Sequence, residues 1–180
     1  HDFSIMDYLV RERPVAISVS GKSHVNGRED TACERVFSPW TDYEARLRAS
    51  GRPLASIESN LPLAAFDIIG VTLQYELSYS NILNMLALAG IPLRRTDRDD
   101  SHPLVVAGGP CAFNPEPLAD FFDFFVLGEA EEVLPEIILA YKDWKCSGIE
   151  SREVFLEAIR HIQGVYVPSF FDVSYNEDGT

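Results

Sequence analysis

The 180-residue chain contains 46% hydrophobic residues and carries a formal net charge of −13. This length suits one domain, and the hydrophobic content is enough for a buried core, which excludes wholesale disorder. The acidic balance argues against a nucleic-acid-binding or anionic-lipid-binding surface, because both need Lys and Arg. From Cys111 onward there are 14 Asp and Glu against 4 Lys and Arg. We expect a solvated acidic face there, with a docking surface for a basic partner as the alternative.

The length of the apolar runs and the spacing of the cysteines indicate a cytoplasmic setting. No apolar run reaches the roughly 18 residues that a membrane span needs, and we expect no secretory leader. The three cysteines, Cys33, Cys111 and Cys146, are widely scattered and odd in number. Their spacing predicts neither a disulfide framework nor a metal site, because paired thiolate ligands normally lie within a few residues of each other.

The amino-terminal part of the chain gives the weakest pattern. Residues 15–20 alternate apolar and polar side chains, which predicts a strand, and the polar, glycine-bearing residues 20–30 predict a loop. Residues 42–50 predict a short helix that ends at Gly51.

The rest of the chain alternates buried strands with amphipathic helices. Near-continuous apolar runs predict strands over residues 66–73, 104–107 and 124–127. Helical spacing of apolar residues predicts helices over residues 80–89, 130–144 and 151–162. Strands and helices in this alternation form βαβ units, so the sequence predicts an α/β fold with a mainly parallel sheet.

Unusual residues follow three successive predicted strands. In open parallel sheets, ligands bind beyond the carboxyl ends of the strands. Polar and aromatic residues follow the first of these strands, paired glycines follow the second, and a Gly-Glu pair opens the long helix after the third. The predicted cofactor-binding residues are Thr72, Gln74, Tyr75, Glu76, Gly108, Gly109, Pro110, Gly128 and Glu129. Each is explained equally well by turn chemistry or by ligand contact, and their coincidence favours a site.

Other motifs give weaker signals. Gly21-Lys22-Ser23 lacks the preceding glycine of a phosphate-binding loop, and Ala16 stands in its place. His24 has the spacing to Gly27 of a cobalt-ligating histidine, but Lys22 replaces the aspartate that would orient the imidazole. We therefore expect a binding edge, no catalytic residues and no metal ligands in this chain.

Five segments resemble one family. They are residues 34–40, 66–79, 106–117, 125–129 and 164–168, which include Ser38-Pro39-Trp40, Gly108-Gly109-Pro110-Cys111 and Gly164-Val165-Tyr166-Val167-Pro168. Together they resemble the N-terminal region of bacterial radical S-adenosylmethionine (radical SAM) proteins that carry a cobalamin-binding-type domain. The resemblance runs from about Glu34 to Pro168, and residues 1 to about 30 do not match the family's opening strand and helix.

The resemblance implies a flavodoxin- or Rossmann-like three-layer domain placed before a radical SAM barrel. That barrel would hold a 4Fe-4S cluster through a Cys-x-x-x-Cys-x-x-Cys loop and cleave S-adenosylmethionine. The loop is absent here, so we expect a non-catalytic fragment whose partner is the downstream barrel of the same polypeptide. The expected divisions are a divergent or truncated start (residues 1–30), a cobalamin-binding-type domain (residues 31–145) and a connector (residues 146–180).

The resemblance leaves the ligand open. Cobalamin binding and a corrin-free scaffold that presents substrate and packs on the barrel are equally compatible with it. A free-standing protein-interaction module and a flavin- or nucleotide-binding domain are the alternatives, because the fold alone does not choose a ligand.

Overall fold

A six-stranded sheet organises the molecule. The computed structural model describes residues 14–25, 28–149, 151–171 and 174, with side chains described from Glu34 onward. The strand order is β2-β1-β3-β4-β5-β6. The strands are β1 (Pro14–Val25), β2 (Arg28–Phe37), β3 (Ile68–Thr72), β4 (Leu104–Gly108), β5 (Phe124–Val126) and β6 (Val165–Tyr166).

The three central strands are parallel. β3 pairs with β4 from Ile68–Leu104 to Thr72–Gly108, and β4 pairs in parallel with β5. Their residues are buried from both sides, which explains why they read as continuous apolar runs in the sequence. The flanking strands β1, β2 and β6 are antiparallel to their neighbours. The predicted α/β class is confirmed, and the antiparallel edges are an addition that the sequence did not predict.

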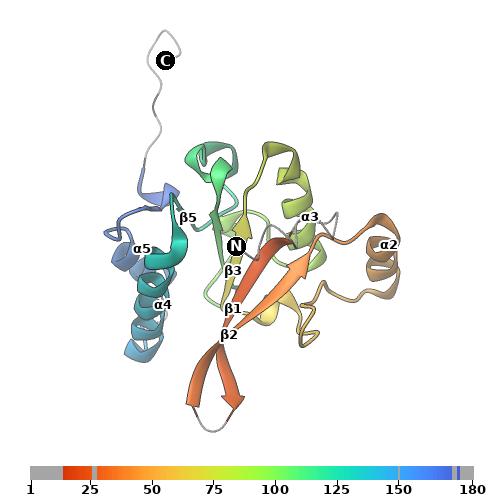
Figure 1. Ribbon diagram of the computed structural model, residues 1–180, viewed down its shortest axis with the longest axis horizontal. Helices are drawn as coiled ribbons and strands as arrows, with labels where there is room; N and C mark the ends of the chain where they lie inside the picture. The colour runs from red at the N-terminus through yellow and green to blue at the C-terminus, as the bar shows by residue number, and fades with distance from the viewer. Residues whose placement is uncertain (1–13, 26–27, 150, 172–173, 175–180) are drawn as a thin grey trace.

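Helices cover both faces of the sheet, so the domain has three layers (Figure 1). On one face, α2 (Thr41–Ser50) and α3 (Tyr79–Leu88) pack on side chains such as Ile69, Val105 and Phe125. On the other face, α4 (Ala130–Ser147) and α5 (Arg152–Ile159) pack on the alternate side chains of the same strands, such as Val106 and Phe124. This alternation is the period-two geometry of a strand and confirms the predicted Rossmann-like arrangement.

The β1–β2 hairpin extends beyond the sheet. β1 pairs with β2 along most of its length but with β3 only from Ala16 to Val19. The outer half of the hairpin therefore stands clear of the other elements (Figure 1). The predicted loop over residues 20–30 is wrong, because strand residues occupy 20–25 and 28–30. Two strands that hydrogen-bond to each other away from the core need no apolar periodicity, so the polar composition misled the prediction.

The expected divisions of the chain stay predictions. Residues 1–13 of the expected divergent start lie outside the described residues, as do residues 172–173 and 175–180 of the expected connector. Within the described part, α5 packs with α4 on one face of the sheet and β6 pairs with β5.

Candidate functional site at the carboxyl edge of the parallel strands

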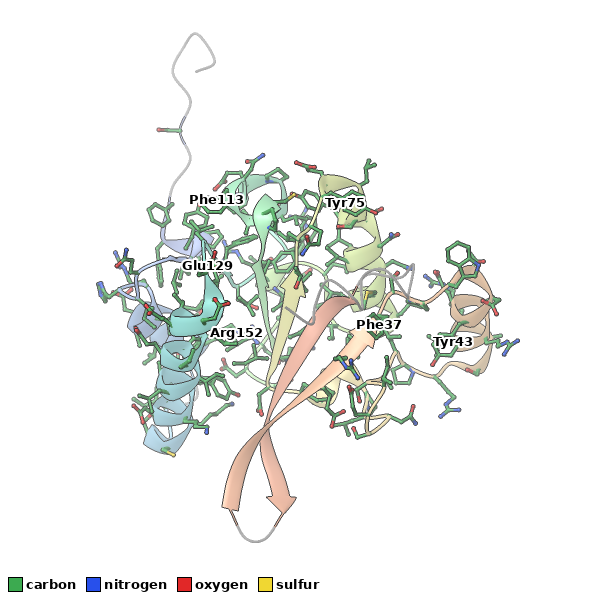
Figure 2. All side chains as sticks on the ribbon, in the orientation of Figure 1. Phe37, Tyr43, Tyr75, Phe113, Glu129 and Arg152 are labelled. Atoms are coloured by element: carbon green, nitrogen blue, oxygen red, sulfur yellow. The ribbon has the colours of Figure 1, made fainter. Side chains whose placement is uncertain are left out.

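The predicted site residues lie where the parallel strands end. β3 ends at Thr72 directly beside Gly108, the last residue of β4. The turns that follow these two strands carry the single helical turns η2 (Glu76–Ser78) and η4 (Pro110–Phe113). The structure thus brings together the first two groups of predicted residues. Tyr75 and Phe113 both lie at the upper edge of the molecule in Figure 2.

Gly109 is required by the packing of the two turns on each other. The Leu73 amide donates a hydrogen bond to the Gly108 carbonyl at 2.7 Å, and the Cys111 amide donates to the Leu73 carbonyl at 3.0 Å. Gly109 has a φ of +96°, and a Cβ there would lie 3.0 Å from the Leu73 carbonyl oxygen. A side chain would therefore be strained and would crowd the Leu73 backbone, which would have to shift. A Cβ on Gly108 would meet the Val126 carbonyl oxygen at 3.6 Å, an ordinary contact.

A carboxylate, a thiol and a phenol meet behind this edge. The half-buried Cys111 thiol lies close enough to Glu76 and to Tyr79, the first residue of α3, for their charges and dipoles to affect it. Burial, followed by the Glu76 carboxylate, raises the pKa of Cys111. Burial, followed by the charges of Cys111 and Glu76, raises the pKa of Tyr79. Both groups therefore hold their protons more firmly, which disfavours the nucleophilic thiolate form of Cys111.

The third predicted group lies on the other layer. Gly128 and Glu129 lead into α4, which packs in the core on the α4–α5 face of the sheet. The turn η4 packs in the core on the opposite, α2–α3 face. A Cβ on Gly128 would meet nothing within 4 Å, although its φ is +102°. Glu129 makes no side-chain capping bond, and Glu131 and Glu132 follow it in the first turn. Acids at this position complement the positive helix terminus, so helix stability accounts for them and ligand contact stays a prediction.

A second contact joins this edge to the carboxyl-terminal strand. The Tyr166 hydroxyl donates a hydrogen bond to Glu116 Oε1 at 2.5 Å, which ties β6 to η5 (Glu116–Leu118). The Tyr166 ring also lies 5.1 Å, between centroids, from the ring of Phe171. Burial, followed by the hydrogen bond to Glu116, raises the pKa of Tyr166 to about 12. The segment after β4 and the segment after β6 are therefore linked through Tyr166.

The amino edge of the same strands holds a buried ionic cluster that the sequence analysis missed. Asp123 accepts hydrogen bonds from Arg152 at 2.8 Å and from the Val105 amide at 2.7 Å, and Arg98 lies 3.4 Å away. All three charged side chains are buried. The available signal was Asp123 itself, an acid inside the apolar run from Phe121 to Phe125. Because a buried charge must be paired, that position predicts an arginine partner.

Comparison with known proteins identifies the family. Residues 23–168 match the family described as "Radical SAM proteins, N-terminal". The chain belongs to this family. The match of this radical SAM N-terminal domain begins in β1 and ends at Pro168, just after β6, so it takes in β2 to β6 with their helices.

One relative shares part of this radical SAM N-terminal domain. "Uncharacterized protein MJ0966" of Methanocaldococcus jannaschii is 31% identical over 100 residues, which are 54% of this chain and 20% of the relative. The chain therefore matches about a fifth of that relative's length. No solved structure matches the chain.

The described residues of this domain offer no cluster ligands. Among them, no three His, Cys, Asp or Glu side chains gather closely enough to hold a metal ion. Cys111 and Cys146 are free thiols on opposite sides of the sheet, in η4 and in α4. They do not fit an iron-sulfur cluster. No helix in the described part of the chain is long and apolar enough to cross a membrane.

Proposed function

We propose that this chain is the N-terminal accessory domain of a radical SAM enzyme and serves there as a corrin-free scaffold. The family match supports the first part. In such an enzyme the 4Fe-4S cluster and S-adenosylmethionine belong to a radical SAM domain of the same polypeptide. The present domain supplies a rigid three-layer body beside that domain and no reacting group of its own.

One observation carries the corrin-free half of the proposal. Gly109, which would let a flat macrocycle approach the strand ends, faces protein instead, because Thr72 and Leu73 at the end of β3 fill the space where its side chain would lie. The segments that follow β3 and β4, residues 73–78 and 109–117, contain no histidine to ligate cobalt. Turn packing therefore accounts for Gly109, one of the two glycines on which the sequence argument for a corrin site rests.

The test is a titration of hydroxocobalamin into the full-length protein, followed by its visible spectrum and by calorimetry. We expect no spectral shift and no heat of binding. The scaffold reading is overturned by micromolar binding that Gly108→Ala weakens, since a Cβ at Gly108 fits the fold and would obstruct only a ligand. Binding of flavin or nucleotide under the same conditions would favour the alternative ligand classes.

A second measurement tests the enzyme context separately. Anaerobic reconstitution of the full-length protein with iron and sulfide is expected to give the absorbance and electron paramagnetic resonance of a 4Fe-4S cluster. Reductive cleavage of S-adenosylmethionine should follow. A full-length protein that binds no cluster would contradict the radical SAM context whatever the cobalamin result.

A further inference from the structure

Exposed apolar side chains gather on the turns at the carboxyl edge. Leu77 in η2 is 84% exposed, Phe113 in η4 is 70% exposed, and Phe171 after β6 is 60% exposed. Tyr75, beside η2, is 38% exposed. We call these four residues the apolar belt. Scattered single exposed apolar residues are ordinary, but several on adjoining turns are typical of an interaction surface.

The segments of the apolar belt touch one another. The Cys111 amide bonds to the Leu73 carbonyl, which joins the turn of Phe113 to the strand that leads to Tyr75. Further along, the hydrogen bond between Tyr166 and Glu116 joins η5 to β6, and the Tyr166 and Phe171 rings contact each other in a tilted arrangement. These bonds link the segments that carry the four residues, from η2 to the residues that follow β6.

Packing holds these side chains outward. Ala112, directly before Phe113, is fully buried, and so is Leu73, which precedes the turn of Tyr75. The Ser78 hydroxyl donates to the Tyr75 carbonyl at 2.7 Å and closes the turn that carries Leu77. The exposure of the belt is thus set by the fold and not by fraying, which lowers the entropy cost of burying it against a partner.

We propose that the apolar belt is the surface on which the radical SAM domain of the same polypeptide docks. This inference rests on the proposed function. The chain itself leads the partner there, because Phe171 belongs to the belt and residues that follow it in the polypeptide start from this surface. A domain tethered at that point has a high effective concentration at the belt.

The negative charge around the belt favours the radical SAM domain over a second copy of this chain as the partner. Glu76 and Glu116 lie beside the belt, and the whole chain carries a net charge of −13. Two such surfaces would repel each other, whereas a partner with Lys and Arg around an apolar centre would be complementary. The docking face of the radical SAM domain is therefore expected to be apolar with a basic rim.

The test uses the full-length protein with Leu77→Asp and Phe113→Asp, each compared with Leu139→Asp. Leu139 is 62% exposed on α4 and lies outside the belt, which makes it a matched control. We expect the two belt variants to increase the radius of gyration in solution scattering and to accelerate proteolysis between the two domains several-fold. Leu139→Asp should leave both quantities at the wild-type value.

Two outcomes overturn the inference. Belt variants that match Leu139→Asp in both measurements overturn it, and a wild-type dimer that Leu77→Asp dissociates assigns the belt to a second copy instead. An unchanged far-ultraviolet circular dichroism spectrum and cluster content show that the variants are folded, as the exposure of both residues predicts. Failure of the wild-type full-length protein to bind a 4Fe-4S cluster is a separate result. It would contradict the proposed function and not the docking geometry.

Discussion

The buried carboxylate of Asp123 and the buried guanidinium of Arg152 lie 2.8 Å apart at the amino edge of the sheet. Arg152 also donates to the carbonyls of Asp99 and His102, at 2.8 Å and 2.7 Å, just before β4. The pair therefore fastens α5 to the starts of both β4 and β5. Together with the Tyr141–Asp67 hydrogen bond, it connects the helical layer of α4 and α5 to the strands of the sheet.

Asp123→Asn should be strongly destabilising. The substitution leaves the buried guanidinium groups of Arg98 and Arg152 without a counter-charge, and breaking one partner of a buried ion pair costs roughly 3–5 kcal/mol. Chemical denaturation followed by tryptophan fluorescence measures the loss. The matched control is Asp120→Asn, which removes an exposed pair with Arg94 and should cost less than about 1 kcal/mol. Equal effects at the two positions would show that the cluster contributes no more than a surface pair.

Apolar periodicity predicted the centre of the fold and failed at its edge. Ile68–Thr72 and Leu104–Gly108 are buried on both faces, so their sequences had to be continuously apolar and were recognisable. The outer hairpin is held by backbone hydrogen bonds between β1 and β2. This pairing requires no pattern of polar and apolar side chains. A sequence cannot reveal that pairing through hydrophobicity, so residues 20–30 were assigned to a loop.

The strand ends that carry the candidate site residues were predictable from the sequence, but the contacts made there were not. The strand ends were located because glycines and polar residues interrupt apolar runs at Thr72, Gly108 and Val126. The contact of Cys111 with Glu76 joins residues far apart in the chain, and only the register of β3 with β4 brings them together. The exposure of Leu77 and Phe113 was not predictable from the sequence either, because an exposed apolar residue in a turn cannot be distinguished there from one that packs inward.

Gly109→Ala should destabilise the domain more than Gly128→Ala. The two glycines have similar φ values, +96° and +102°, so both substitutions incur the strain of a side chain in this region, roughly 1–3 kcal/mol. Only at Gly109 does the new Cβ also approach the Leu73 backbone to 3.0 Å. Overpacking adds about 1–3 kcal/mol. Thermal unfolding of both variants measures the difference, and equal melting temperatures would mean that η4 moves away from β3 without cost.

Cys111 should react slowly with alkylating agents, and Glu76→Gln should accelerate the reaction several-fold. The reactive form of the side chain is the thiolate, and burial, followed by the neighbouring carboxylate, raises the pKa of Cys111. Removal of that charge lowers the pKa and increases the thiolate fraction at mildly alkaline pH. Mass spectrometry of the Cys111 peptide after iodoacetamide treatment gives the rate, with Glu129→Gln at the other side of the edge as the control. An unchanged rate in Glu76→Gln would show that burial alone protects the thiol.

Tyr166 should make the stability of the domain fall at high pH. Its pKa in the folded protein is about 12, above the ordinary value of about 10, because burial and the bond to Glu116 favour the neutral phenol. A raised pKa means that the contribution is complete below about pH 10 and is lost as the pH rises toward about 12. Tyr166→Phe removes this contribution, so its unfolding free energy should decline less steeply over that interval than that of the wild type. The phenolate absorbance of Glu116→Gln should appear at lower pH than in the wild type, and identical titrations of all three proteins would contradict a role for the Tyr166–Glu116 bond in joining β6 to the carboxyl edge.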